Sequence, residues 1–189
     1  FRHTFKQFLP EYTLSEEELL SFLGPPLRES FARYLSGHQV DEAVEVYRAY
    51  NREKHNDYVT LYPHETEVLK KLHEEGIKMA IVTTKYKDAA VYGLKCADLD
   101  QYFDVVIGSD EVTHGKPHPE ALRVALSHLN ATKGYMIGDN VTDIQAGKNA
   151  GIGTIGVTWS LKGTQFLLEE HPDYMMESYD DLYQYLERM

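Results

Sequence analysis

Cysteine is almost absent from this sequence, and the absence limits how the chain is stabilised. Cys96 is the only one in 189 residues, so an internal disulfide is excluded and a reducing cytosol is the simplest compartment. The N-terminal stretch FRHTFKQFLPEY lacks the apolar core of a signal peptide, and no apolar run is long enough to span a membrane. We therefore predict a cytoplasmic protein without a membrane partner.

Positive charge is also scarce. The chain has 19 Lys and Arg against 30 Asp and Glu, which gives a formal net charge of −11 and, with it, a sequence pI near 5.2. Nucleic-acid backbones are bound mainly through clustered Lys and Arg, so a general nucleic-acid role is excluded. An acidic protein still binds a small phosphate where a local Lys and a metal ion reverse the field.

The composition that remains is that of a globular protein, with 42% hydrophobic residues. The first third of the chain has a helical pattern. Thr13 and Ser15 are alternative N-caps, each followed three residues later by a Glu, and further helices are predicted over 27–35 and 40–55. We assign residues 1–62 to a small α-helical domain.

After Pro63 apolar runs and helical segments alternate. The pattern predicts strands at 77–82, 104–108, 134–138, 154–159 and 174–176, and helices at 64–75, 87–94, 119–129, 142–150 and 179–187. The first of these strands reads as a buried one. Such alternation implies an α/β fold, a doubly wound parallel sheet with helices on both faces, over residues 63–189. Ligands in these sheets bind at the carboxyl ends of the strands.

One such strand end carries the sequence GDNVTD, residues 138–143, directly after an apolar run. Asp139 and Asp143 are then placed where a strand becomes a helix, and two carboxylates at that point are typical of a Mg²⁺ site that holds phosphates. Helix capping is the alternative interpretation, because Asp and Asn are common N-caps and acids are favoured in a first helical turn. Capping accounts for one acid more easily than for two.

Two other strand ends carry groups that suit an anion. Thr83 and Thr84 follow the strand at 77–82 and offer hydroxyls and backbone amides, although threonine is also simply a good strand residue. Lys116, in HGKPHPE, follows the strand at 104–108 and lies between stiffening prolines. A solvated surface lysine is the alternative there. All these residues are predicted to lie at one edge of the sheet.

Three further patterns are set aside. The sequence GIGTIG at 151–156 satisfies GxGxxG, but it leaves a helix and enters a strand, the reverse of a dinucleotide-binding turn. The pair Asp98 and Asp100 is interpreted as a turn. His114 and His118 are four residues apart, but Pro117 between them breaks the helical face that a paired metal site would need.

Together, Thr83 after a strand, Lys116 in GKPHPE and the acids of GDNVTD resemble the haloacid dehalogenase-like phosphatases in order and spacing. Longer segments, including FLGPPLRESF, RAYNREKHN, FDVVIGSDEV and GVTWSLKG, are similar to the branch that holds phosphoglycolate phosphatases and the pyrophosphatase associated with the phosphocarrier HPr. The resemblance spans most of the chain. It implies a Rossmann-like core with residues 1–62 as its α-helical cap domain.

The resemblance implies a Mg²⁺-dependent phosphohydrolase that forms an aspartyl-phosphate and acts on pyrophosphate or a small phosphomonoester such as phosphoglycolate. Thr83 would bind the transferring phosphoryl group, with Thr84 as a neighbouring contact. Lys116 would neutralise phosphate and nucleophile. Asp139 would ligate Mg²⁺, and Asp143 would join it directly or through water.

The sequence departs from the family at its start. The family opens with a central strand ending in DxDGT, which supplies the nucleophile and the acid/base, and neither is present. We hypothesise that the natural protein has this strand upstream of Phe1 and that the sequence from Phe1 onward is inactive by itself. Two alternatives stay open: a sugar-phosphate mutase of the same fold, and an inactive phosphate-sensing or partner-binding module.

Overall fold

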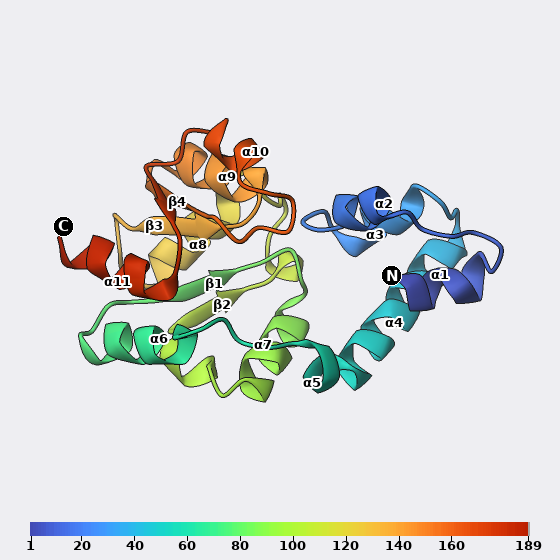
Figure 1. The fold of residues 1–189 in the computed structure, drawn as a ribbon, viewed down its shortest axis with the longest axis horizontal. Helices are drawn as coiled ribbons and strands as arrows, with labels where there is room; N and C mark the ends of the chain where they lie inside the picture. Colours follow the sequence, from blue (N-terminus) through green and yellow to red (C-terminus); the bar gives the residue numbers. More distant parts are fainter. Residues whose placement is uncertain (189) are drawn as a thin grey trace. The chain divides into compact units, whose positions relative to one another are not determined.

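The computed structural model describes residues 1–188, and the chain divides into two compact units, Phe1–Val59 and a second that begins at Thr60 (Figure 1). The first unit is entirely helical. Its helices are α1 (Arg2–Phe8), α2 (Glu16–Ser21), α3 (Leu27–Ala32), α4 (His38–Glu53) and α5 (His55–Tyr58). None of the described helices in either unit combines the length and apolar character needed to cross a membrane.

Aromatic side chains build the core of the first unit. Phe5 of α1, Phe22 after α2 and Phe31 of α3 are buried together, and α4 adds Val40 and Val44 from one face. Spacings of three and four residues place such side chains on the same side of a helix. The sequence pattern predicted α2, α3 and α4 but not α1, whose N-cap Phe1 makes no side-chain capping bond.

The start of α2 decides between the two predicted caps. Ser15 is the N-cap: its Oγ accepts a hydrogen bond from the Glu18 amide at 3.1 Å, and Glu18 Oε2 accepts one from the Ser15 amide at 2.8 Å. This reciprocal pair satisfies two amides that a helix start leaves without intrahelical partners. Thr13 lies outside the helix.

The second unit alternates strands and helices in the order that the sequence predicted. Its elements are α6 (Glu65–Glu74), β1 (Ala80–Val82), α7 (Lys87–Cys96), η1 (Asp100–Tyr102), β2 (Val105–Ile107), η2 (Ser109–Glu111), α8 (Glu120–His128), β3 (Tyr135–Gly138), α9 (Val141–Ala150), β4 (Gly153–Val157), α10 (Gln165–Leu168), β5 (Tyr174–Met176) and α11 (Tyr179–Glu187). The predicted bounds of β5 and α11 are confirmed; the short η1, η2 and α10 were not predicted.

The strands form two parallel sheets. In the first, β1 pairs with β2, with Ile81 opposite Val106; in the second, β4 lies between β3 and β5, with Ile155 opposite Ile137 and Tyr174. Parallel strands need crossover helices, and the segments between them are long enough to hold one. The predicted α/β class with a parallel, helix-covered sheet is confirmed.

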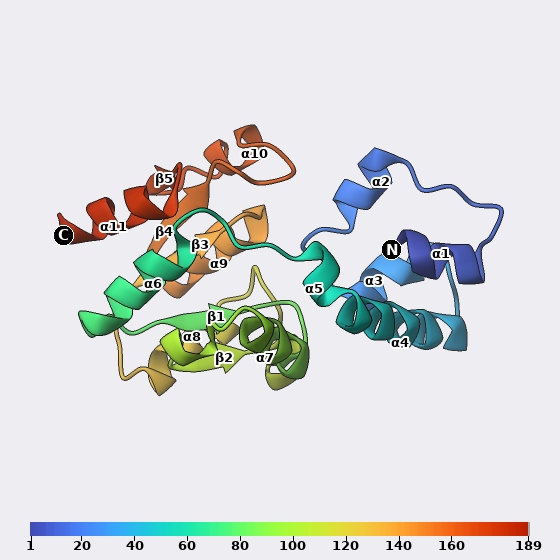
Figure 2. The same cartoon turned by 60° about the horizontal axis from the view of Figure 1, so that its bottom comes forward.

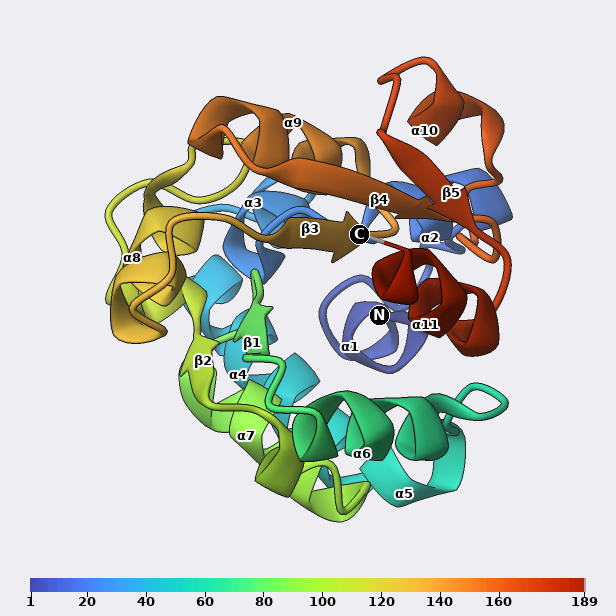
Figure 3. The same cartoon turned by 90° about the vertical axis from the view of Figure 1, so that its left-hand side faces the viewer.

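Helices cover both faces of the three-stranded sheet (Figure 3). On one face, α6 and α11 pack against Ile155 and Val157 of β4. On the other, α9 approaches so closely that a side chain at Gly147 would overlap Thr154, and Met136 packs there as well. The β1–β2 pair packs against α7 and α8 (Figure 2).

β1 and β3 each have an edge that no described strand pairs with. Val82 at the end of β1 packs in the same apolar cluster as Met136 of β3, so the two strands belong to one core. All three residues of β1 are only partly buried, and Ile137 of β3 is 38% exposed. The prediction of a buried strand from Ile77 is therefore wrong in extent, because pairing begins at Ala80 and Ile77 is exposed.

Candidate active site

Lys116 connects two segments at the carboxyl ends of the strands. Its Nζ donates a hydrogen bond to the carbonyl of Val82, the last residue of β1, at 3.0 Å. The same Nζ lies 2.6 Å from Oδ1 of Asp143 in the first turn of α9. Both side chains are buried, with 10% and 7% of their surface exposed. An isolated charge is costly to bury, and the Asp143 carboxylate offsets that cost for the Lys116 ammonium.

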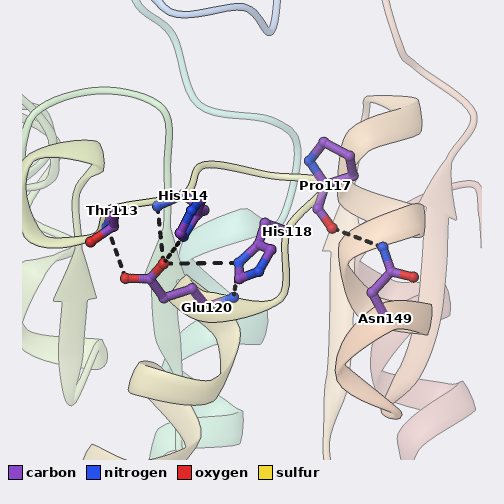
Figure 4. A network of polar contacts seen from close by, with 6 residues as sticks. All are labelled: Thr113, His114, Pro117, His118, Glu120 and Asn149. Carbon is purple, nitrogen blue, oxygen red and sulfur yellow. Dashed lines mark hydrogen bonds and ion pairs between the residues drawn. The ribbon is translucent and has the colours of Figure 1, made fainter.

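The loop that carries Lys116 runs from η2 to α8 and is tied to its surroundings by hydrogen bonds (Figure 4). Asn149 of α9 donates to the carbonyl of Pro117 at 3.0 Å, and Glu120 accepts from the backbone amides of Thr113 and His114. Hydrogen bonds thus fix the backbone both before and after Lys116. The alternative of a solvated surface lysine is wrong, because the side chain is buried.

Asp143 is both a capping residue and the partner of Lys116. Its Oδ2 accepts from the amide of Asn140, the N-cap of α9, at 3.0 Å, while Oδ1 faces the ammonium. The β3 residue Gly138 leaves room for it, since a Cβ there would overlap the Asp143 carboxylate. Capping and ion pairing are compatible because a carboxylate offers about four lone-pair sites.

Asp139 lies directly after β3 and is exposed. Its Oδ1 accepts from the side-chain amide of Asn140 at 3.0 Å, which orients the carboxylate. The carbonyl of Asp139 accepts from Ser160 Oγ at 2.9 Å, so the loop after β4 fixes its backbone as well. Of the two predicted acids, Asp139 is therefore the accessible one and Asp143 the buried one.

Thr83 extends the pairing of β1 with β2, because its amide donates to the carbonyl of Ile107 at 3.0 Å. The prediction that this amide is available to an anion is wrong for that reason. The hydroxyl of Thr83 accepts from the Lys85 amide at 3.1 Å and keeps its own proton to donate. Thr84 follows it and is partly buried.

Sequence reasoning missed three residues around Asp139. Ser160 contacts its backbone, and Lys162 Nζ donates to Asn140 Oδ1 at 3.1 Å. Burial, and secondarily the negative charge of Asp139, raise the pKa of Tyr62, so its hydroxyl stays protonated at neutral pH. The signal for Ser160 and Lys162 was available, since their loop follows β4 and so lies at the same strand ends.

The patterns set aside earlier have different outcomes. Gly151, with a φ of 75°, ends α9 and precedes β4, which confirms that GIGTIG is not a strand-to-helix turn. His114 and His118 lie in a loop, not on a helix, and their ring centroids are 4.5 Å apart, so Pro117 does not keep the two rings from meeting.

Comparison with known proteins places the chain in a family. Residues 1–157 match the haloacid dehalogenase-like hydrolases. A pyrophosphatase PpaX from Listeria monocytogenes is 45% identical over 184 residues, which cover 96% of this chain and 84% of the relative; one from Bacillus velezensis is 42% identical with the same coverage. The chain belongs to the haloacid dehalogenase-like hydrolase family.

A solved structure agrees with this assignment. A haloacid dehalogenase-like family hydrolase from Streptococcus pneumoniae superposes with a TM-score of 0.84 at 29% identity, covering 98% of this chain and 88% of the other. The resemblance noted from the sequence is confirmed, as is the prediction of a phosphatase-family enzyme.

The donors at the strand ends fit a hard divalent cation. Such ions take oxygen ligands, often one or two carboxylates with waters and substrate phosphates. Asp139 supplies an exposed, oriented carboxylate and Asn140 an amide beside it. Both carboxylate oxygens of Asp143 already have partners, Lys116 and the Asn140 amide. Asp143 is therefore better placed to contact a metal ion through a water molecule than to bind it directly.

Proposed function

We propose that this protein is a Mg²⁺-dependent phosphohydrolase that acts on pyrophosphate, with small phosphomonoesters such as phosphoglycolate as the second substrate class. Two PpaX relatives at 42–45% identity favour pyrophosphate among the members of the family. The observation that carries the proposal is Lys116, a buried ammonium held between the end of β1 and the start of α9.

The roles of the individual side chains follow from their positions. An ammonium has three donors, so Lys116 can give one to a phosphate oxygen while keeping its bonds to Val82 and Asp143. Thr83, next to Val82, can donate its hydroxyl proton to the same phosphoryl group, with Thr84 as a neighbouring contact. Together they stabilise negative charge on a transferring phosphoryl group.

Asp139 and Asp143 are the residues that would hold Mg²⁺, Asp139 directly and Asp143 through water. The bound ion would supply the charge neutralisation that phosphoryl transfer needs. Lys116 neutralises the remaining charge from the other side.

We infer that the nucleophile, an aspartate that forms an aspartyl-phosphate, belongs to a strand upstream of Phe1. The separate edges of β1 and β3 and the partial exposure of Ile137 favour a strand between them. We assign residues 63–189 to the catalytic core and 1–62 to a cap that selects the substrate, in a protein of the cytoplasm.

The test is phosphate release by the longer natural protein and by the chain from Phe1. Pyrophosphate, phosphoglycolate and a sugar phosphate are compared, each with Mg²⁺ and with a chelator. We expect rapid Mg²⁺-dependent release from pyrophosphate by the longer protein and none by the chain from Phe1. Turnover by the chain from Phe1 alone would show that our nucleophile assignment is wrong.

Asp139→Asn tests the metal site. Loss of one carboxylate ligand should lower kcat at least about a hundredfold, on the scale of a lost catalytic charge contact, while the exposed position leaves the fold intact. Asp100→Asn is the matched control, because Asp100 is exposed and precedes β2 at the opposite edge of the sheet. Equal activity of Asp139→Asn and the control would show that Asp139 is not part of the metal site.

A further inference from the structure

Three metal-ligating side chains come together where the loop after η2 meets α8: His114 and His118 of the loop, and Glu120 of α8. His114 Nδ1 lies 2.9 Å from Glu120 Oε2, and His118 Nδ1 lies 3.9 Å from the same oxygen (Figure 4). One ligand atom from each of the three residues falls within 4.8 Å of the others. The proposed reaction does not use this cluster.

Local hydrogen bonds hold the cluster together. Glu120, the first residue of α8, accepts from the amides of Thr113 and His114 at 2.8 and 3.0 Å. Its own amide donates to His118 Nδ1 at 3.3 Å, and the His118 amide donates to the carbonyl of Gly115 at 3.0 Å. These bonds hold both imidazoles next to the Glu120 carboxylate, with His114 hydrogen-bonded to it and His118 bonded to the amide of the same residue.

The donor types select the ion. Two imidazole nitrogens and one carboxylate form a ligand set typical of Zn²⁺, whereas Mg²⁺ and Ca²⁺ prefer oxygen ligands throughout. Ligands of a tetrahedral zinc lie about 3.3 Å apart, given bonds of about 2.0 Å, so the cluster needs only small side-chain rotations. The rings are free to make them, since His114 and His118 are 61% and 49% exposed.

We propose that His114, His118 and Glu120 bind a Zn²⁺-class transition-metal ion, with water completing the coordination. Lys116 lies between the two histidines, so the ion would clamp the loop that positions this ammonium. Binding itself is independent of the proposed function; only the consequence for catalysis, through Lys116, rests on it.

The experiment is a titration of the metal-free chain with Co²⁺, followed by visible absorption, and with Zn²⁺, followed by calorimetry. We expect one ion of each metal per chain and no displacement by millimolar Mg²⁺. His114→Gln and His118→Gln should each weaken binding at least about tenfold, the lower range for disturbing a metal site. Glu120 is left unchanged because it also supports the loop.

His38→Gln is the matched control: an exposed histidine at the start of α4, in the other unit. It should bind as the unmodified chain does. Equal affinities in all four proteins, or no binding, would overturn the proposal. Zinc held instead at the strand ends would be lost in Asp139→Asn and kept in both loop variants, which also overturns it while leaving the proposed function standing.

Hydrogen exchange gives a second measurement. Zn²⁺ should slow exchange of the amides in 112–119 severalfold in the unmodified chain and in His38→Gln, but not in His118→Gln. A loop whose exchange is unchanged while Zn²⁺ is bound would show that the ion does not clamp it.

Discussion

At the scale of single residues, the pairing of Lys116 with Asp143 organises the site. Breaking a buried ion pair by removing one partner costs about 3 to 5 kcal/mol, because the other charge stays buried. The pair therefore couples stability to function. Any change that moves Asp143 also frees the ammonium, and Gly138 controls that position because a Cβ there would overlap the Asp143 carboxylate.

Gly138→Ala should destabilise the second unit by about 1 to 3 kcal/mol, the usual cost of overpacking, and should lower activity in the longer protein. Urea unfolding followed by fluorescence of Trp159, the only tryptophan, measures the change. Gly134→Ala, just before β3, is the control, since its Cβ would meet only a Leu126 methyl at an ordinary 3.9 Å. Equal stability of the two variants would show that Asp143 can shift without cost.

Sequence reasoning located the strand-end residues but not their bonds. That Thr83, Lys116 and the two acids follow strand ends is visible in the sequence, and the rule for parallel sheets puts such residues at one edge. The sequence does not show that Lys116 also pairs with Asp143, because this contact depends on how the loop that carries Lys116 is buried in the folded protein. The histidine pair was discounted because periodicity describes helices and strands, whereas Glu120 gathers these rings through bonds to loop amides.

At the scale of elements, capping and hydrophobic period predicted most helices. They missed α1, which has no side-chain cap, and the short η1, η2 and α10. β5 and α11 match their predicted bounds. α10 has four residues, which is too short for a helical hydrophobic pattern to be recognised. The start of α2 was ambiguous between Thr13 and Ser15, because both precede a Glu by three residues. Glu18 decides it, since Tyr12 and Tyr34 also donate to its carboxylate.

These bonds predict a pH dependence for α2. The Tyr12 hydroxyl, followed by the Ser15 amide and Tyr34, lowers the pKa of Glu18 to about 2. A carboxyl whose pKa is depressed by folding stabilises the folded state above its unfolded pKa, and that stabilisation is lost as pH falls through the folded value. The loss should therefore occur between about pH 4.5, the ordinary value, and pH 2.

Hydrogen exchange of residues 12–34 checks this. Glu18→Gln should speed exchange relative to the unmodified chain at pH 6, and the difference should shrink towards pH 2. Glu17→Gln, an exposed neighbour in the first turn of α2, is the control and should exchange like the unmodified chain. A difference that stays constant with pH would show that the Glu18 charge does not stabilise α2.

At the scale of the whole molecule, the two sheets of the second unit share one apolar core without sharing a hydrogen-bonded strand. Val82 packs with Met136, yet β1 pairs with β2 alone and β3 with β4 alone among the described strands. Unpaired strand edges are sites where another strand adds readily. Composition and hydrophobic period predicted parallel strands but not which strands pair. The gap between β1 and β3 is what the family resemblance predicts, because the central strand that the family has there is missing from this sequence.

If an upstream strand fills the position between β1 and β3, the longer protein should protect both edges. Each Val- or Ile-sized side chain that becomes fully buried contributes about 1.5 to 3 kcal/mol, and Ile137 at 38% exposure has much left to bury. Amide exchange of 80–82 and 135–138 should slow at least tenfold relative to the chain from Phe1. The internal control is β4, which is already paired on both sides. Amide exchange in β4 should change only as much as the global stability of the protein changes. Identical exchange of β1 and β3 in the two proteins would place the nucleophile's segment elsewhere.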